Sequence, residues 1–310
     1  MDNTKGMTSF AVVAREVFTT MGAEWSDGYL RNNESHLRNA LLPFMVMPIQ
    51  KVTTEVVDKW WAANAARPVN RRNAYFVLTV IMKNAVRWKY IRSSPCLIKK
   101  PGKDYSKPRP RFTYLQLAGV IDRMPENMRA ACWVAFSAHL RLGEIVGLNR
   151  GDFDPESGKL TISRQVSPVG GTHLKNTKTN NVRVITPMEP GLTVLREYVA
   201  GRAQLPSAPL FVGVRGDRLA RGVLSSAWVA AREEQGLPDL HFHDTKRVSL
   251  TAFAKTGASI KQIMARGGHL SSAAALAYQD AAMEEDAELA ARASALLPRL
   301  DFTGTVGATA

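Results

Sequence analysis

Five side chains that could together break a phosphodiester bond follow one another along the chain downstream of residue 140. Tyr278 stands nine residues after His269, in the run G-G-H-L-S-S-A-A-A-L-A-Y-Q-D, and Arg141, Lys178 and His243 precede them. Cationic side chains can hold a pentavalent phosphate, an imidazole can move a proton, and a phenol can attack. The set indicates phosphoryl transfer through a tyrosine, with no metal and no cofactor.

The two cationic candidates each have an ordinary alternative. An arginine fork binds two phosphate oxygens at once, and Glu144 lies one helical turn after Arg141, where it could hold the guanidinium in place. A plain surface Arg–Glu pair is the alternative. Lys178, beside a predicted hairpin, is a candidate general acid for the 5′-oxygen leaving group. A lysine near a strand end is usually only solvated.

The remaining three candidates carry the same ambiguity. His243 could move the nucleophile's proton, and His269 could donate a hydrogen bond to the scissile phosphate. A lone histidine is more often structural. Tyr278 needs activation because the pKa of free tyrosine is about 10, and packing within an Ala-rich helix is its alternative. The order of all five residues is a stronger signal than any one of them.

The net charge of +14 favours a polyanionic partner, with nucleic acid as the first candidate. Residues 1–110 hold 18 Lys and Arg against 8 Asp and Glu, which leaves +10 in the first third of the chain. A generic basic surface is the alternative. The candidate DNA-binding residues are Arg71, Arg72, Lys83, Arg87, Lys99, Lys100, Lys103, Lys107 and Arg109.

Several classes of protein are disfavoured. Cys96 and Cys132 form no C-x-x-C pair, so neither a disulfide scaffold nor a zinc site is expected. No run of 18 apolar residues predicts a membrane span, and the N-terminus lacks the pattern of a secretory signal. We therefore expect a cytoplasmic protein.

Periodicity predicts a helical first domain over residues 1–92 and a mixed domain over residues 112–298. Between them, residues 93–111 are basic and proline-rich, which favours a linker lying along DNA; a solvated spacer is the alternative. Residues 299–310 form a tail. The first domain has four predicted helices: Ser9–Met21, Tyr29–Leu42, Val52–Ala65 and Asn70–Tyr90. The second has two predicted strands, Lys159–Val166 and Asn181–Thr186, among helices that include Arg141–Leu148 and Ala273–Leu296.

These blocks resemble the tyrosine recombinase, or phage integrase, family. The resemblance runs from about Ser9 to Leu297 and rests on A-H-L-R-L-G-E-I, N-T-K-T-N-N-V-R-V, H-D-T-K-R, G-G-H and Tyr278; the C-terminal run is most like integrases of actinobacterial phages. It implies an α+β, mainly α fold: a helical, SAM-like core-binding domain and a catalytic domain with a small antiparallel sheet. It also implies site-specific integration or excision of phage or mobile-element DNA through a 3′-phosphotyrosine.

The resemblance carries expectations about partners. It implies that the protein binds double-stranded DNA at attachment sites and does not bind a membrane. It also implies a monomer in solution and a homo-tetramer in the synapse. A host integration factor and an excisionase are further partners that it allows. The expected location is the cytoplasm of a bacterial host, on the nucleoid.

The chain departs from the family in two places. The second arginine of the family belongs three residues after His243, and that position is Lys246. Arg247 follows, about 100° further round a helix. Lysine keeps the charge but loses the planar fork. Three alternatives stay open: Arg247 takes the place of the second arginine, Lys246 acts more slowly but sufficiently, or catalysis is impaired. The helical pattern begins near Ser9, which leads us to expect no N-terminal domain for arm-type sites.

Two alternatives therefore stay open. One is a DNA-binding regulator of the same fold whose catalysis is weakened by Lys246. The other is an enzyme like a type IB topoisomerase, which shares the tyrosine chemistry.

Overall fold

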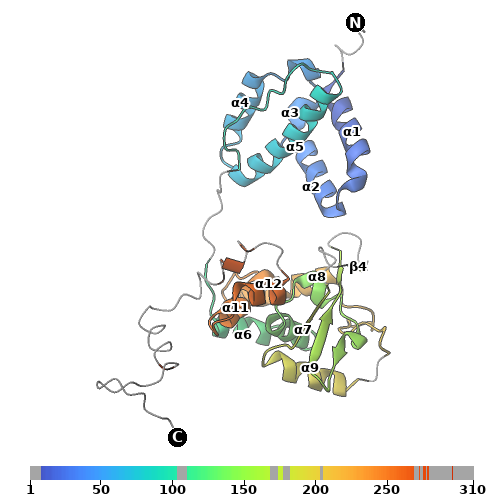
Figure 1. Cartoon of the computed structure of the whole chain (residues 1–310), viewed down its shortest axis with the longest axis vertical. Helices are drawn as coiled ribbons and strands as arrows, with labels where there is room; N and C mark the ends of the chain where they lie inside the picture. The colour runs from blue at the N-terminus through green and yellow to red at the C-terminus, as the bar shows by residue number, and fades with distance from the viewer. Residues whose placement is uncertain are drawn as a thin grey trace, which may run out of the picture. The chain divides into compact units, whose positions relative to one another are not determined.

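The chain divides into two units, residues 1–109 and 110–310, in a computed structural model. It describes residues 8–102, 110–167, 174–176, 182–202, 205–268, 272, 275–276, 278 and 295. No described helix is long and apolar enough to cross a membrane. Figure 1 shows helices alone in the first unit and a small sheet among helices in the second.

Three of the five α-helices described in the first unit begin at a capping side chain. Ser9, Ser26 and Thr53 each accept a hydrogen bond from a backbone N–H in the first turn that follows, which typically stabilises a helix by about 1 kcal/mol. The helices are α1 (Phe10–Met21), α2 (Asp27–Arg38), α3 (Leu42–Met45), α4 (Thr54–Ala63) and α5 (Pro68–Arg87). Both α1 and α2 pack against α5, the longest helix among the described residues (Figure 1).

The described start of the expected linker packs on this first unit. Pro95 is buried, and Cys96 and Ile98 lie against the helical core. The backbone N–H of Ile98 donates to the hydroxyl of Tyr75 at 3.0 Å. Pro95, Cys96 and Ile98 therefore hold this stretch on the first unit, whereas Leu97 is exposed. The basic residues that follow, Lys99 and Lys100, are exposed as well.

The second unit is built around α7, a mostly apolar helix. The helices are α6 (Tyr114–Asp122), α7 (Glu126–Ser137), α8 (Leu142–Ile145), α9 (Gly191–Ala200), α10 (Arg221–Glu234), α11 (Phe242–Ala254) and α12 (Ile260–Gly267). Both α9 and α11 pack against α7, which buries Cys132 and Val134 among others. The core of this unit positions α8 and α11, which carry the candidate residues.

Two small antiparallel sheets complete the unit. The strands are β1 (Phe153–Asp154), β2 (Lys159–Ile162), β3 (Arg164–Val166), β4 (Leu174–Asn176) and β5 (Arg183–Ile185). One sheet has the order β1-β2-β5, with Leu160 opposite Phe153 and Ile185, and β3 pairs with β4 in a separate hairpin. The prediction of a mainly α fold with a small antiparallel sheet is confirmed.

Some element predictions need correction. The expected strand Lys159–Val166 is interrupted at Ser163, and its two halves pair in different sheets. The expected helix Arg141–Leu148 is one turn, and Arg141 is its N-cap because Glu144 accepts from the Arg141 backbone N–H. Most of the expected helix Ala273–Leu296 lies outside the described residues.

Candidate active site

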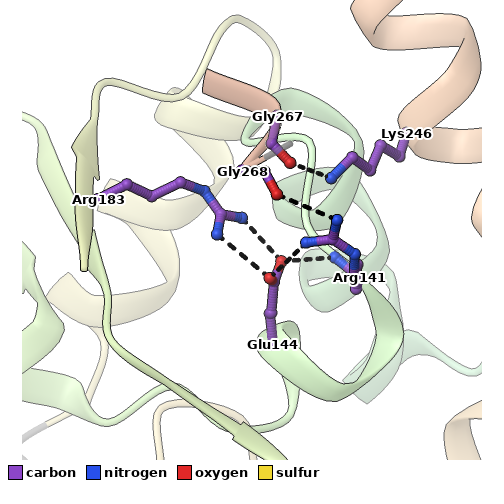
Figure 2. Close-up of polar contacts among 6 residues, drawn as sticks. All are labelled: Arg141, Glu144, Arg183, Lys246, Gly267 and Gly268. Carbon is purple, nitrogen blue, oxygen red and sulfur yellow. Dashed lines mark hydrogen bonds and ion pairs between the residues drawn. The ribbon is translucent and has the colours of Figure 1, made fainter. Parts of the chain in front are cut away.

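Glu144 lies at the centre of a network of hydrogen bonds and ion pairs, drawn in Figure 2. Its carboxylate accepts from the backbone N–H of Arg141 at 2.9 Å and from the Arg141 Nη1 at 3.0 Å. Arg183 on β5 donates from both of its Nη atoms, at 2.7 and 3.2 Å. The Glu144 side chain is 2% exposed, that of Arg183 9% and that of Arg141 39%. Glu144 thus holds Arg141 while leaving its guanidinium accessible.

The network fixes the charge of Glu144. Burial raises the pKa of a carboxyl group, but the hydrogen bonds and charge of Arg183, with those of Arg141, lower the pKa of Glu144 to about 2. Glu144 is therefore ionised at neutral pH. A buried, ionised carboxylate with two guanidinium partners is a rigid support for Arg141.

Lys246 and Arg141 bind neighbouring carbonyl groups at the end of α12. Lys246, on α11, is fully buried, and its Nζ donates to the carbonyl of Gly267 at 2.5 Å. The Arg141 Nη2 donates to the carbonyl of Gly268 at 3.3 Å. Figure 2 shows both cationic side chains converging on this turn from different elements. Burial and the nearby charge of Arg141 lower the pKa of Lys246 to about 7, and the carboxylate of Glu144 opposes that shift.

Gly268 is suited to its place by having no side chain. It caps α12 with a φ of 60°, in the left-handed region that glycine adopts without strain. A Cβ built on Gly268 would lie 3.0 Å from the Arg183 Nη1. The turn can therefore approach Arg141 and Arg183 only as glycine.

Tyr278 lies close enough to Arg141 and Arg247 for their positive charges to act on its hydroxyl. It is half-buried against a small apolar cluster that includes Leu250 and Ile263. Burial raises the pKa of Tyr278, whereas Arg141 and Arg247 act to lower it and Asp244 acts to raise it. The phenol is therefore protonated at neutral pH, and an attack on phosphorus requires its proton to be removed.

The other predicted site residues lie on α11 or outside the described part of the chain. His243 lies in the first turn of α11 and is exposed. Arg247 is partly buried on the same helix and lines a pocket with Asp244 and Tyr114. Lys178 and His269 lie outside the described residues, and so do Lys103, Lys107 and Arg109 among the basic candidates.

Arg71 needs correction as a surface residue. It is 9% exposed, its guanidinium stacks on Trp61 with its Cζ 4.1 Å from the ring centroid, and its Nη1 donates to the Trp61 carbonyl. A cation over an aromatic face in a buried position is a packing contact. Of the other candidates on α5, Lys83 and Arg87 are exposed and Arg72 is partly exposed.

Arg183 is the residue that the sequence did not reveal. The run V-R-V-I alternates, and an apolar face made of Val182 and Val184 would place the arginine outward. The structure reverses that face: Val182 and Val184 are 61% and 55% exposed, and Arg183 turns inward with Ile185. The buried carboxylate of Glu144 accounts for this orientation, and nothing near Arg183 in the sequence indicates it.

Comparison with known proteins agrees with this geometry. Residues 112–285 match the model of the phage integrase family. The integrase of Mycobacterium phage D29 is 31% identical over 271 residues, covering 84% of this chain and 72% of the relative. The putative prophage phiRv2 integrase of Mycobacterium tuberculosis H37Rv is 29% identical over 296 residues, covering 88% and 78%. The chain belongs to the phage integrase family of tyrosine site-specific recombinases.

Solved structures show the same fold at low sequence identity. The Tn1549 transposon integrase in complex with circular intermediate DNA has a TM-score of 0.76 and 15% identity, covering 92% of this chain and 99% of that chain. A lambda integrase tetramer bound to a Holliday junction has a TM-score of 0.71 and 16% identity, covering 87% and 80%.

Proposed function

We propose that the protein cuts and rejoins double-stranded DNA at attachment sites, with Tyr278 as the nucleophile. The observation that carries this proposal is that Tyr278 lies close enough to Arg141 and Arg247 for their charges to lower its pKa, in a chain of the phage integrase family. The phenol oxygen attacks phosphorus, the bond to the 5′ oxygen breaks, and the 3′ phosphate stays on Tyr278. No metal or cofactor takes part.

Two protons move in this step. The phenolic proton leaves Tyr278, and His243 is its proposed acceptor, since an imidazole near neutral pH can take it. The departing 5′ oxygen gains a proton, for which Lys178 is the proposed donor. His269 donates a hydrogen bond to the phosphate. In the reverse step a 5′ hydroxyl attacks the phosphotyrosine and releases Tyr278.

Arg141 is proposed to bind the phosphate. Its guanidinium is already oriented by Glu144 and the Gly268 carbonyl, so little reorganisation is needed when charge develops on the phosphate oxygens. Its 39% exposure leaves it accessible to DNA. Glu144 is a positioning residue in this proposal, and Arg183 supports Glu144.

Lys246 is proposed to supply the second positive charge. It lies beside Arg141 and Glu144 and is held by the Gly267 carbonyl. A phosphate bound nearby favours its charged form. Because an ammonium lacks the planar fork of an arginine, we propose that strand cleavage is slower than it would be with arginine at position 246.

The first unit is proposed to be the core-type DNA-binding domain, and the second the catalytic domain. Paired attachment sites are proposed to bring four copies together, as in the lambda integrase tetramer bound to a Holliday junction. A host integration factor and an excisionase are proposed as further partners, and the bacterial cytoplasm, on the nucleoid, as the location.

A nicked suicide substrate tests the proposal. Cleavage releases a short 5′-hydroxyl strand that diffuses away, which traps the protein on DNA as a covalent adduct visible in a denaturing gel. Tyr278→Phe should abolish the adduct while leaving the Kd for DNA unchanged, because it removes one hydroxyl and little volume. Adduct formation by Tyr278→Phe refutes the assignment. Adduct without strand exchange between two sites supports the topoisomerase-like alternative, and wild-type binding without any adduct supports the regulator.

A further inference from the structure

His139 occupies a backbone position that usually belongs to glycine. The Leu140 N–H donates to the Ala135 carbonyl and the His139 N–H donates to the Phe136 carbonyl, so that the chain reverses directly after α7. In this type of helix ending the residue after the cap adopts the left-handed conformation, and His139 has a φ of 54°. A histidine tolerates that conformation less well than glycine does. Its side chain must therefore make contacts that offset the strain.

The imidazole of His139 is fully buried and bonded at both nitrogens. The Arg266 Nε lies 2.7 Å from the His139 Nε2, and the Ser249 Oγ lies 2.7 Å from the His139 Nδ1. A guanidinium can only donate, so Nε2 must accept, and the ring is neutral with its proton on Nδ1. That proton is donated to Ser249, whose hydroxyl donates in turn to the Lys246 carbonyl at 3.3 Å.

The bonds form a closed loop that includes Lys246 of the candidate active site. Arg266 directly precedes Gly267, whose carbonyl accepts from the Lys246 Nζ. From Arg266 the loop passes through His139 and Ser249 and returns to the backbone of Lys246. His139 is also two residues before Arg141 in the chain. One side chain therefore links three elements: the start of α8, helix α11 and the end of α12.

The surroundings keep the ring in this state. Burial, with the charges of Arg266, Lys246 and Arg183, lowers the pKa of His139 well below its usual value. Phe253 packs beside it, with the ring centroids 5.9 Å apart, and also lies under the guanidinium of Arg266 at 4.7 Å. The Arg266 Nη2 donates to the Thr186 carbonyl, which fixes the other edge of the guanidinium.

We infer that His139 is a positioning residue for strand cleavage: through Arg266 and Ser249 it fixes the turn at Gly267 and Gly268 against Lys246 and Arg141. The inference rests on the proposed function for its effect on rate. Its effect on the turn is a separate physical claim, because the bonds that carry it do not involve DNA.

Substitutions at His139 separate the effect of losing the imidazole ring from the effect of backbone strain. His139→Asn keeps a residue that tolerates the left-handed conformation but is too short to accept from Arg266. His139→Gly relieves the backbone and also lacks the ring, so an effect shared by the two variants comes from the lost ring and not from backbone strain. Arg266→Met removes the donor. Ile121→Val on α6 is the control, because it reduces packing at a buried residue of the same unit that belongs neither to the hydrogen-bonded loop nor to the apolar cluster around Tyr278.

Two measurements test the inference on the full chain. Hydrogen exchange of peptides covering 260–268 should speed up about tenfold in His139→Gly and His139→Asn and stay near wild type in Ile121→Val. Unchanged exchange in both histidine variants overturns the inference, whether or not the wild type cleaves DNA. Wild-type protein without any covalent adduct contradicts the proposed function alone.

The second measurement is the single-turnover rate of adduct formation at saturating protein. It should fall at least tenfold in His139→Asn and Arg266→Met, with less than a threefold change in the Kd for DNA. The double variant should fall no further, since both changes break one link. The positioning role is overturned if Ile121→Val lowers the melting temperature and the rate in the same proportion as the histidine variants. Additive losses in the double variant overturn it as well.

Discussion

A carboxylate that is 2% exposed stabilises the fold only while its partners remain. Removing one partner of a buried ion pair typically costs about 3–5 kcal/mol, because the remaining charge stays buried. Glu144 has two guanidinium partners, and the more buried one, Arg183, makes two of the hydrogen bonds. The orientation of Arg141 therefore depends on a residue that has no direct contact with it in the described hydrogen bonds.

Glu144 should give the protein a distinct loss of stability in acid. The pKa of Glu144 is about 2 in the folded state against about 4.3 unfolded, so its contribution is present above pH 4.3 and is lost as pH falls toward 2. The slope is at most about 1.4 kcal/mol per pH unit. Glu144→Gln should remove this slope in urea unfolding between pH 5 and pH 3. Glu34→Gln, in an exposed pair with Arg38, should leave it unchanged; equal slopes in wild type and Glu144→Gln contradict the argument.

Lys246 should be sensitive to shape as well as to charge. Lys246→Ala should lower the rate of adduct formation on the order of 10²-fold, as expected for a lost transition-state donor. Lys246→Arg should keep or raise the rate, because a guanidinium can bind two phosphate oxygens. The control is Lys261→Ala, at an exposed lysine on α12. A large loss in Arg247→Ala with a mild one in Lys246→Ala reassigns the role to Arg247.

At the scale of elements, the sequence predicts where helices start but not which strands pair. The sequence predicts helices that start at Ser9 and Val52, and in the structure Ser9 and Thr53 cap these helices, because capping depends on residues three apart. The interruption at Ser163 depends on β2 pairing with β5 and β3 with β4, which are distant choices. The inward turn of Arg183 likewise depends on Glu144, 39 residues away. The local sequence pattern predicts the pair of Arg141 and Glu144. Their third partner, Arg183, comes from a contact between distant parts of the chain.

The end of α12 should tolerate no side chain at Gly268. Gly268→Ala combines a left-handed backbone with a Cβ 3.0 Å from Arg183, so it should displace Arg183 from Glu144. Gly236→Ala is a matched control, with a φ of 73° and nothing within 4 Å of its Cβ. Both should lose about 1 kcal/mol or more from backbone strain. Only Gly268→Ala should also lose adduct formation at saturating protein, and equal rates for the two variants refute the contact argument.

For the whole molecule, charge and family together predict binding to DNA through phosphate contacts. The net charge of +10 in residues 1–110 is the property that the sequence alone could establish. Which cations lie on one surface required the structure, since Arg71 is buried against Trp61. On α5, Arg72, Lys83 and Arg87 fall within about 60° of one another at 100° per residue, so they can contact one stretch of DNA backbone.

Neutralising that face of α5 should change the salt dependence of DNA binding. Each phosphate contact contributes about 0.9 to the slope of log K against log salt concentration, so the triple variant Arg72→Ala, Lys83→Ala, Arg87→Ala should lose up to about 2.7 of slope. Arg71→Met is the contrast: it should lower the melting temperature, because the guanidinium over Trp61 is lost, and leave the slope unchanged. Fluorescence anisotropy of a labelled duplex from 50 to 300 mM salt measures both. A triple variant with the wild-type slope shows that α5 does not face the phosphates, and a shallower slope in Arg71→Met shows that its burial does not keep it from DNA.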